Sequence, residues 1–389
     1  MVLKVSKRGQ VPPFIVMDVM REAALRVASG KDVVHLEVGQ PGGRPPRAVL
    51  EAAKLALEDE SETLGYTLAL GHQGLRERIA RFYKDGHKID LEADRVVVTT
   101  GSSGAFLLAF LAAFEAGDRV ALAAPGYPAY RNILTALGCE VVTIPVDGAT
   151  HFHPTPAHLE ALDRPVDGLI VASPSNPTGS MLSPHALKAL AEWCHVKGVR
   201  LVSDEIYHGI VYGEPAATAL GFSDSAIVVN SFSKYYALTG WRLGWMVVPP
   251  ELVRSVECLA QNLTIAPPTL SQISAMAVFD ATSELDARVA GYAANRALLL
   301  DRLPALGFDK LAPADGAFYL YADIGHLTND SPQFCKRILA ECGVALTPGT
   351  DFDPLRGHLS VRFSLAGPMS DMEEAVRRLA RIPLQSIRS

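Results

Sequence analysis

One lysine of the chain stands directly after an apolar run, where a lysine is not expected. Residues 226–230 read AIVVN, which is typical of a buried strand, and the next residues are SFSK, ending at Lys234. A buried amine is costly unless a partner neutralises it. Ser231 and Ser233 beside it, and Arg242 eight residues further on, can donate hydrogen bonds to an anion. The segment predicts a site that combines an amine with bound negative charge.

Other apolar runs are also followed by polar groups, and each group does a different kind of chemistry. The residues concerned are Ser102, Ser103 and Gly104 after run 95–99, Tyr127 after 119–123, Asn176 after 168–172, and Asp204 and Tyr207 after 200–203. Taken singly, each has an ordinary explanation: a tight turn, a helix cap, a salt bridge or a core aromatic. Together with the amine of Lys234 they supply small donors, an amide, a carboxylate and two phenols.

The elements that must position these groups follow from the spacing of the apolar runs. Seven short runs rich in β-branched residues recur, at 95–99, 119–123, 140–144, 168–172, 200–203, 226–230 and 245–248. Near-continuous apolar strands separated by helical stretches predict an α/β fold with a mostly parallel seven-stranded sheet covered by helices. Ligands of such sheets bind beyond the carboxyl ends of the strands, so the polar groups are expected to meet at one edge.

This collection of groups matches the parts of one cofactor. The GSSG sequence at 101–104 opens a helix, and a helix N-terminus with glycines and hydroxyls is suited to a phosphate. Arg242 can add a forked pair of donors. A carboxylate for a ring nitrogen, a phenol and an amide for a ring oxygen, and a lysine for an aldehyde then describe pyridoxal 5′-phosphate.

The two ends of the chain predict a second, smaller α/β domain. A helix is expected after Pro12 and Pro13, with Gly30 as its stop. Towards the C-terminus we expect strands at 316–324 and 358–365, a capped helix from Ser331 to Gly343, and a last helix opened by a capping box from Ser370 to Glu373. The predicted domains are residues 1–45, packing with the small domain, 46–275, the large cofactor-binding domain, and 276–389, the small domain.

Composition excludes several classes of protein. The 389 residues are 49% hydrophobic and 20% charged, with a net charge of −6, which disfavours nucleic acid as a partner. The apolar run 105–114 is too short to cross a membrane, and no secretory signal is recognisable at the start. Five cysteines without a CxxC pair suit the cytoplasm. The HFH sequence at 151–153 has no further ligand at metal-binding spacing, so we expect an ordinary loop and no metal.

The motifs together resemble one known family. The chain is similar to the class I and II aminotransferases, which are pyridoxal-phosphate enzymes of fold-type I and include the aspartate aminotransferases. The similarity runs from EVGQP at 37–41 to SVRFSLA at 360–366, and SFSKYYALTGWRLGW is its most specific part, with NPTG and SDEIY upstream. The resemblance implies that the α-amino group of an L-amino acid passes to a 2-oxo acid in a ping-pong reaction.

The resemblance also implies a role for each matching residue. Lys234 would hold the cofactor as a Schiff base and act as the base, Asp204 would face the ring nitrogen, and Tyr127 would stack on the ring. Asn176 and Tyr207 would bond to its phenolic oxygen. The phosphate would be held by Ser102, Ser103, Gly104, Ser231, Ser233 and Arg242.

Further implied roles concern the substrate and a second subunit. Arg362 would grip the α-carboxylate of the amino acid, helped by Asn176 and the backbone of Gly39. Tyr66 would reach the phosphate of a neighbouring subunit, which implies a homodimer.

Two departures and two rival functions qualify the resemblance. The loop GQPGGRPP at 39–46 replaces the family's GEPD pattern, and Ser103 stands where many aspartate-specific relatives have a lysine, which counts against aspartate as substrate. Residues 11–17, VPPFIVM, either bring apolar side chains over the site or simply lead into a helix.

A Cβ–S lyase shares the same motifs. A non-catalytic sensor module would need a DNA-binding region, and we expect none.

Overall fold

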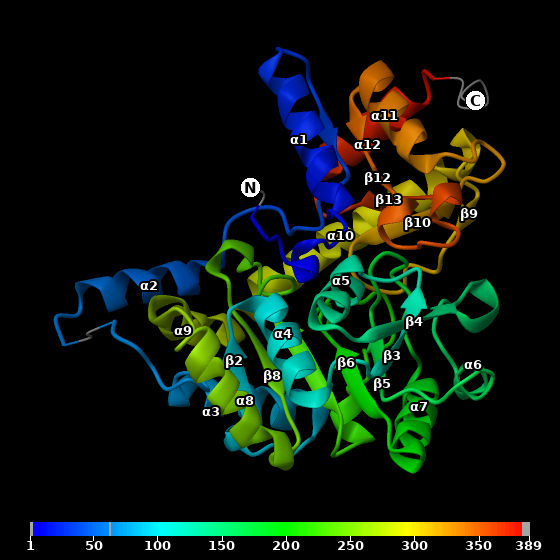
Figure 1. Ribbon diagram of the computed structural model, residues 1–389. Coiled ribbons are helices and arrows are strands. Elements are labelled where there is room, and N and C mark those ends of the chain that lie inside the picture. The colour runs from blue at the N-terminus through cyan, green and yellow to red at the C-terminus, as the bar shows by residue number, and fades with distance from the viewer. Residues whose placement is uncertain (1–2, 62–63, 383–389) are drawn as a thin grey trace.

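The computed structural model describes residues 3–61 and 64–382, and its largest element is a sheet of seven strands. Across the sheet the strand order is β2-β8-β7-β6-β5-β3-β4. The strands are β2 Val96–Thr99, β3 Arg119–Ala124, β4 Glu140–Pro145, β5 Gly168–Ala172, β6 Arg200–Asp204, β7 Ile227–Ser231 and β8 Gly244–Val247. All seven predicted strands are therefore present, and Figure 1 shows them in the lower half of the molecule.

Pairing confirms a mostly parallel sheet. Strands β3 to β7 pair in parallel, whereas β8 runs antiparallel to both of its neighbours, β2 and β7. Strands β2, β6 and β7 are buried along their whole length apart from Arg200 at the start of β6, which explains their continuous apolar sequences. The carboxyl ends of the five parallel strands consequently lie at one edge.

Helices cover both faces of this sheet, as predicted. On one face pack α4 Gly101–Ala113, α5 Pro128–Leu137 and α8 Pro250–Leu263. On the other pack α3 Gln73–Phe82, α7 Pro184–Lys197 and α9 Thr269–Ala275. The remaining helices of this part are α2 Arg47–Glu58, which packs on α9, and the short α6 Pro156–Glu160.

Helix α7 shows how local sequence fixes an element. The Ser183 hydroxyl accepts from the backbone N–H of Ala186, Pro184 occupies the first turn, and Gly198 ends the helix in the left-handed conformation. Both predicted ends are confirmed.

A second, smaller part is built from segments near the two ends of the chain. Its antiparallel sheet has the order β12-β13-β10-β9, and β1 pairs in parallel with β11. Its strands are β1 Val34–His35, β9 Lys310–Leu311, β10 Tyr319–Asp323, β11 Val344–Ala345, β12 Thr347–Pro348 and β13 Ser360–Ser364. Its helices are α1 Ile15–Ala28, α10 Thr282–Arg302, α11 Ser331–Cys342 and α12 Met369–Leu379.

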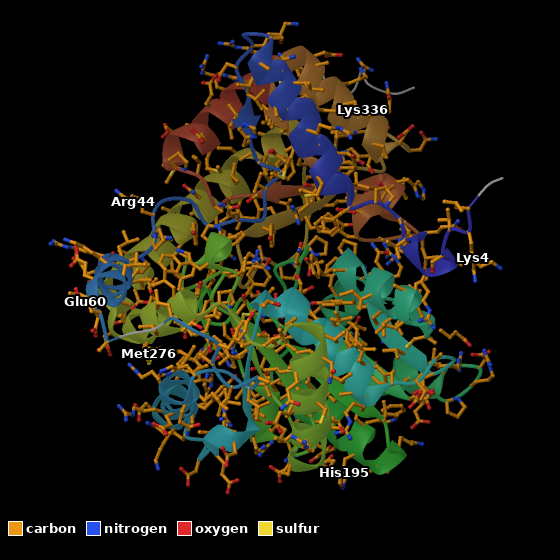
Figure 2. The ribbon with its side chains drawn as sticks, turned by 60° about the vertical axis from the view of Figure 1, so that its left-hand side comes forward. Lys4, Arg44, Glu60, His195, Met276 and Lys336 are labelled. Atoms are coloured by element: carbon orange, nitrogen blue, oxygen red, sulfur yellow. The ribbon has the colours of Figure 1, made fainter. Side chains whose placement is uncertain are left out.

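The N-terminal segment joins this smaller part. Figures 1 and 2 show α1 beside α11 in two views, and the two helices share a surface groove lined by Val19 and Leu339. The parallel pairing of β1 with β11 adds a backbone link between the two ends of the chain. The predicted domain limits at 45 and 275 remain predictions.

One predicted helix cap was wrong. The last helix begins at Met369 after Pro368, and no side chain caps it, so Ser370 lies inside the first turn and the predicted capping box to Glu373 is absent. The predicted capped helix from Ser331 to Gly343 is confirmed as α11, and its cap is the Asp330 side chain, which accepts from the N–H of Gln333.

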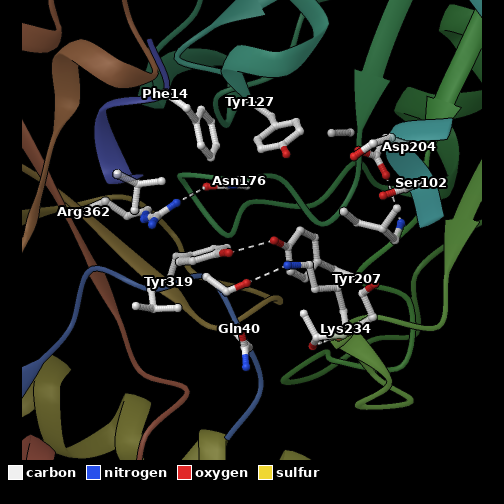
Figure 3. Close-up of a pocket in the computed structure, with 18 of the residues that line it drawn as sticks. Phe14, Gln40, Ser102, Tyr127, Asn176, Asp204, Tyr207, Lys234, Tyr319 and Arg362 are labelled. Atoms are coloured by element: carbon white, nitrogen blue, oxygen red, sulfur yellow. Dashed lines mark hydrogen bonds between the residues drawn. The ribbon is translucent and has the colours of Figure 1, made fainter. Parts of the chain in front are cut away.

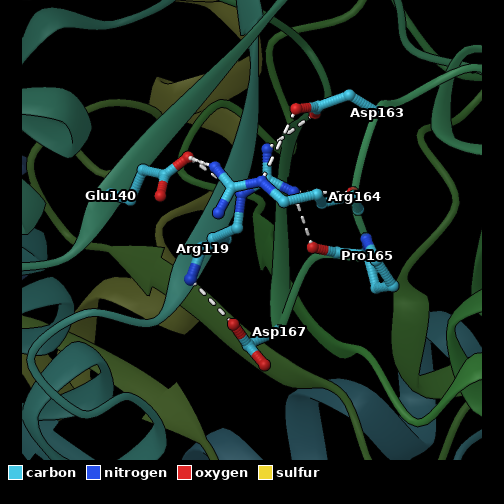
Figure 4. A network of polar contacts seen from close by, with 6 residues as sticks. All are labelled: Arg119, Glu140, Asp163, Arg164, Pro165 and Asp167. Atoms are coloured by element: carbon cyan, nitrogen blue, oxygen red, sulfur yellow. Dashed lines mark hydrogen bonds and ion pairs between the residues drawn. The ribbon is translucent and has the colours of Figure 1, made fainter.

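At the amino end of the main sheet, one arginine ties several segments together. Arg119, the first residue of β3, donates to the carboxylates of Glu140 and Asp163 and to the backbone carbonyls of Arg164 and Pro165 (Figure 4). Its own backbone N–H donates to Asp167, just before β5. The network ties the start of β3 to the start of β4 and to the segment before β5, at the end of the sheet opposite the predicted site.

Candidate active site

The predicted residues converge on one cavity of about 330 Å³ beyond the carboxyl ends of the strands. Those that line it are Gly39, Ser102, Ser103, Tyr127, Asn176, Asp204, Tyr207, Ser233, Lys234, Arg242 and Arg362. They come from the N-terminal segment, from five different strand ends of the main sheet and from β13 of the small sheet. Figure 3 shows many of them pointing toward a common space.

Lys234 reaches into this cavity from the segment that follows β7. Its Nζ donates to the carbonyl oxygen of Gly39 at 2.6 Å and lies 5.5 Å from the centre of the Tyr207 ring. The pKa of the amine is lowered from 10.5 to about 8, first by burial and then by the positive charge of Arg362, while the charge of Asp204 raises it. A lysine with such a pKa is neutral, and so reactive, in about a tenth of molecules at pH 7, far more often than an ordinary lysine.

Asp204 ends β6 at the floor of the cavity and is 2% exposed. Its Oδ1 accepts from the backbone N–H of Ile206 at 3.0 Å, and its Oδ2 accepts from the hydroxyl of Tyr130. Burial raises the pKa of this carboxyl to about 6, although both hydrogen bonds and the charge of Lys234 favour the ionised form. A protonated ring nitrogen would give this buried carboxylate the cationic partner that it needs.

Tyr130 was not among the predicted site residues, and the structure places its hydroxyl in hydrogen-bond contact with Asp204. It lies on α5 one turn after Tyr127, and the two rings meet edge to face at 5.3 Å. A spacing of three residues puts two side chains on the same helix face, so this neighbour of Tyr127 could have been found from the sequence.

Arg362 is a buried cation that no carboxylate of the described residues pairs with. It is 3% exposed, and its guanidinium donates to the amide oxygen of Asn176 at 2.9 Å and to the carbonyl oxygen of Glu37 at 2.6 Å. The guanidinium carbon, Cζ, lies 4.4 Å from the centre of the Tyr319 ring and 4.7 Å from the centre of the Phe352 ring. Within residues 3–61 and 64–382, no carboxylate lies at ion-pair distance from it. Such a group is prepared for an anionic ligand.

Donors for a second anion gather at the N-terminus of α4. Gly101 has a φ of +76°, and a Cβ there would come within 2.5 Å of Nη2 of Arg242. Glycine therefore lets the guanidinium reach the first turn of the helix, where free N–H groups and the hydroxyl of Ser102 lie. The Ser231 hydroxyl accepts from the backbone N–H of Ser233 at 3.0 Å and fixes that loop.

Three predicted cofactor residues do not line the cavity. Gly104 lies one turn into α4, and Ser231 is buried behind Ser233. Tyr66 is 84% exposed on the surface of its own chain. Their roles remain predictions, and that of Tyr66 requires a second subunit.

An apolar wall closes the cavity on the side of the N-terminal segment. Phe14, Val16, Met17 and Met20, at and near the start of α1, line it together with Tyr127. The carboxylate of Asp351 holds this end of the helix, because it accepts from the backbone N–H groups of Ile15 at 3.0 Å and Val16 at 3.3 Å. Of the two open interpretations of residues 11–17, the structure supports the one that brings apolar side chains over the site.

The structure offers no support for a metal at the HFH sequence. His151 bonds to Asp315 at 2.6 Å, and in the described part of the chain no three His, Cys, Asp or Glu side chains are grouped as metal ligands. The same residues contain no helix that is both long and apolar enough to span a bilayer.

Fold and site together define an enzyme that moves amino groups between amino acids and oxo acids, an aminotransferase. The chain belongs to the aminotransferase class I and II family, whose model matches residues 31–379. This family depends on pyridoxal phosphate, in agreement with the donors gathered in the cavity.

Individual relatives are similar over nearly the whole chain. The valine–pyruvate aminotransferase of Mycobacterium tuberculosis is 55% identical over 380 residues, which cover 97% of each protein. A crystal structure of an aminotransferase from that organism has a TM-score of 0.95 at 54% identity, covering 98% of this chain and 99% of that one. The aspartate aminotransferase of Thermus thermophilus with maleate has a TM-score of 0.92 at 30% identity, covering 98% and 100%.

The environment of Lys234 predicts how its reactivity depends on pH. Acylation of the ligand-free enzyme by a small reagent, read at the Lys234 peptide by mass spectrometry, should rise with pH through a midpoint near 8, because only the neutral amine reacts. Arg362→Gln should move the midpoint upward, since it removes a positive charge that lowers this pKa. A wild-type midpoint near 10.5 would contradict the electrostatic account.

Proposed function

We propose that this enzyme binds pyridoxal 5′-phosphate in the described cavity and uses it to transfer the amino group of a neutral, aliphatic L-amino acid to a short 2-oxo acid. The observation that carries the proposal is the placement of Lys234 between two anion sites, one at α4 and Arg242 and the other at Arg362. Phosphate and substrate carboxylate would occupy these two sites. Asp204 and the pair Asn176 and Tyr207 complete the donor set that the cofactor requires.

Each residue has a task that follows from its position. Bound there, pyridoxal 5′-phosphate supplies an aldehyde that takes up amino groups and a pyridine ring that accepts electrons. Asp204 keeps a proton on the ring nitrogen by charge pairing. Arg362 and Asn176 hold the carboxylate of the amino acid and so orient its Cα–H bond. Lys234, once its amine is free, takes the proton from Cα, since it is the base that shares the cavity with that carbon.

The wall formed by α1 supports the choice of substrate class. Its side chains are apolar, and the three cations that line the cavity, Lys234, Arg242 and Arg362, all have other tasks in this scheme. A distal carboxylate, as in aspartate, would find no further cation among the described lining residues. The name of the valine–pyruvate relative agrees with this proposal.

We further propose that the enzyme is a homodimer. Tyr66 is 84% exposed, and Leu55, Leu57 and Leu68 nearby in the sequence are each more than 60% exposed. Exposed apolar side chains of this number favour a contact with another chain. A second copy would cover them and bring Tyr66 to the phosphate of its partner.

The central proposal is tested by Lys234→Ala. Purified wild-type enzyme should gain a visible absorption band when pyridoxal 5′-phosphate is added. The variant should lack that band, and its turnover rate should fall at least about a thousandfold, because the residue that both anchors the cofactor and acts as the base is gone. Lys188→Ala, a change of an exposed lysine on α7, serves as the control and should leave both unchanged. Turnover that survives in Lys234→Ala would reject the assignment.

The substrate class is tested by the order in which amino acids bleach the visible band. Valine should act much faster than aspartate. Met20→Lys should lower kcat/KM for valine about tenfold or more and raise it for aspartate, because a charge replaces part of the apolar wall. Leu25→Lys, at the exposed side of the same helix, should change neither.

The rival lyase chemistry predicts a different product. Release of pyruvate and ammonia from a cysteine-type substrate without any oxo acid would favour it.

The homodimer is tested by mixing two defective chains. Tyr66→Phe should weaken cofactor affinity roughly tenfold or more, since a hydrogen bond to a charged phosphate is lost. A hybrid dimer contains one Tyr66→Phe chain and one Lys234→Ala chain. If Tyr66 serves the site of its partner, one site of the hybrid carries both defects and the other carries none. High cofactor affinity should then return in half of the sites. If Tyr66 served its own chain, the hybrids would show no recovery.

A further inference from the structure

Tyr319, a residue of β10 that was not among the predicted site residues, contacts three groups of the cavity at once. Its hydroxyl lies 2.8 Å from the hydroxyl of Tyr207, and its ring face lies against the guanidinium of Arg362. At Gly39, a Cβ would come within 2.3 Å of the Tyr319 hydroxyl, so only glycine fits there. Figure 3 shows Tyr319 between Arg362 and Tyr207. Its position is therefore fixed from several sides.

The count of hydroxyl protons decides the direction of the Tyr207–Tyr319 hydrogen bond. A phenol has one proton to donate. If Tyr207 gives its proton to the ring oxygen of the cofactor, it can only accept from Tyr319, so Tyr319 must be the donor. Within residues 3–61 and 64–382, the Tyr319 hydroxyl has no other hydrogen-bond acceptor, which leaves its proton available for Tyr207.

The contact also joins the two sheets of the molecule. Tyr207 follows β6 of the main sheet, whereas Tyr319 begins β10 of the small one, next to the strand that bears Arg362. In a series of hydrogen bonds from Tyr319 through Tyr207 to the cofactor, the first bond strengthens the second, since each hydrogen bond polarises its neighbour.

We propose that Tyr319 is a positioning residue with two separable parts. Its hydroxyl donates to Tyr207 and thereby directs the Tyr207 proton to the ring oxygen of the cofactor, while its ring face holds the guanidinium plane of Arg362 for the substrate carboxylate. This inference rests on the proposed function, because it assigns Tyr207 to the cofactor and Arg362 to the substrate.

The hydroxyl is tested by Tyr319→Phe, which keeps the ring. The readout is the pH midpoint of the visible band of the loaded enzyme. A hydrogen bond from Tyr207 offsets part of the negative charge on the ring oxygen. That negative charge stabilises the protonated form of the nitrogen through which Lys234 is linked to the cofactor. Weakening the bond should therefore raise the midpoint, by about half a pH unit to one unit. KM for valine should stay within twofold, because the ring still covers Arg362.

The ring is tested by Tyr319→Leu, which should raise the midpoint similarly and also raise KM for valine roughly three- to tenfold. Tyr321→Phe is the matched control, because it also removes a buried hydroxyl from β10. The Tyr321 hydroxyl bonds to the hydroxyl of Ser360 and does not line the cavity. It should change neither quantity.

A double variant separates this inference from general damage to the site. In a Tyr207→Phe background, Tyr319→Phe should shift the midpoint no further, since the receiving hydroxyl is already gone. A midpoint equal to that of the wild type in Tyr319→Phe, or shifts that add in the double variant, would overturn the inference while the proposed function stands. A wild-type protein that forms no visible band would instead overturn the proposed function itself.

Discussion

The buried guanidinium of Arg362 is the constraint on which the rest of the site depends. A cation that is 3% exposed and has no carboxylate partner among residues 3–61 and 64–382 must be held by neutral oxygens and aromatic faces. Its holders are the carbonyl of Glu37, the amide oxygen of Asn176, the hydroxyl of Thr347 and the rings of Tyr319 and Phe352. These holders come from the N-terminal segment, the main sheet and the small sheet, so one charge requires all three to meet.

The same meeting of segments sets the electrostatics of Lys234. Burial and the nearby guanidinium lower the pKa of its amine, while Asp204 on the opposite side limits the effect. Asp204 is in turn held by Tyr130 and by a backbone N–H group, so its position does not depend on the lysine. An amine that is easily freed of its proton, beside a fixed carboxylate and two anion sites, is the arrangement that an aminotransferase needs.

Much of this site could be predicted because parallel strands send their carboxyl ends to one edge. Lys234, Asp204 and Asn176 each follow an apolar run, and their predicted meeting in one cavity is confirmed. The predictions that failed were local ones. Ser370 was expected to cap a helix that begins one residue earlier, at Met369 directly after Pro368. Tyr130 was missed although its spacing from Tyr127 was available in the sequence.

The sequence by itself determined the strands, the order of the polar groups at their ends and the family to which the chain belongs. Those features depend on hydrophobic periodicity and on short motifs, which are local. Only the tertiary structure decided that Tyr319 lies between Tyr207 and Arg362, and that α1 places Met20 on the wall of the cavity. Such contacts join residues that are distant in the sequence, 112 positions apart for Tyr207 and Tyr319, and no local pattern in one sequence encodes the packing of one sheet against another.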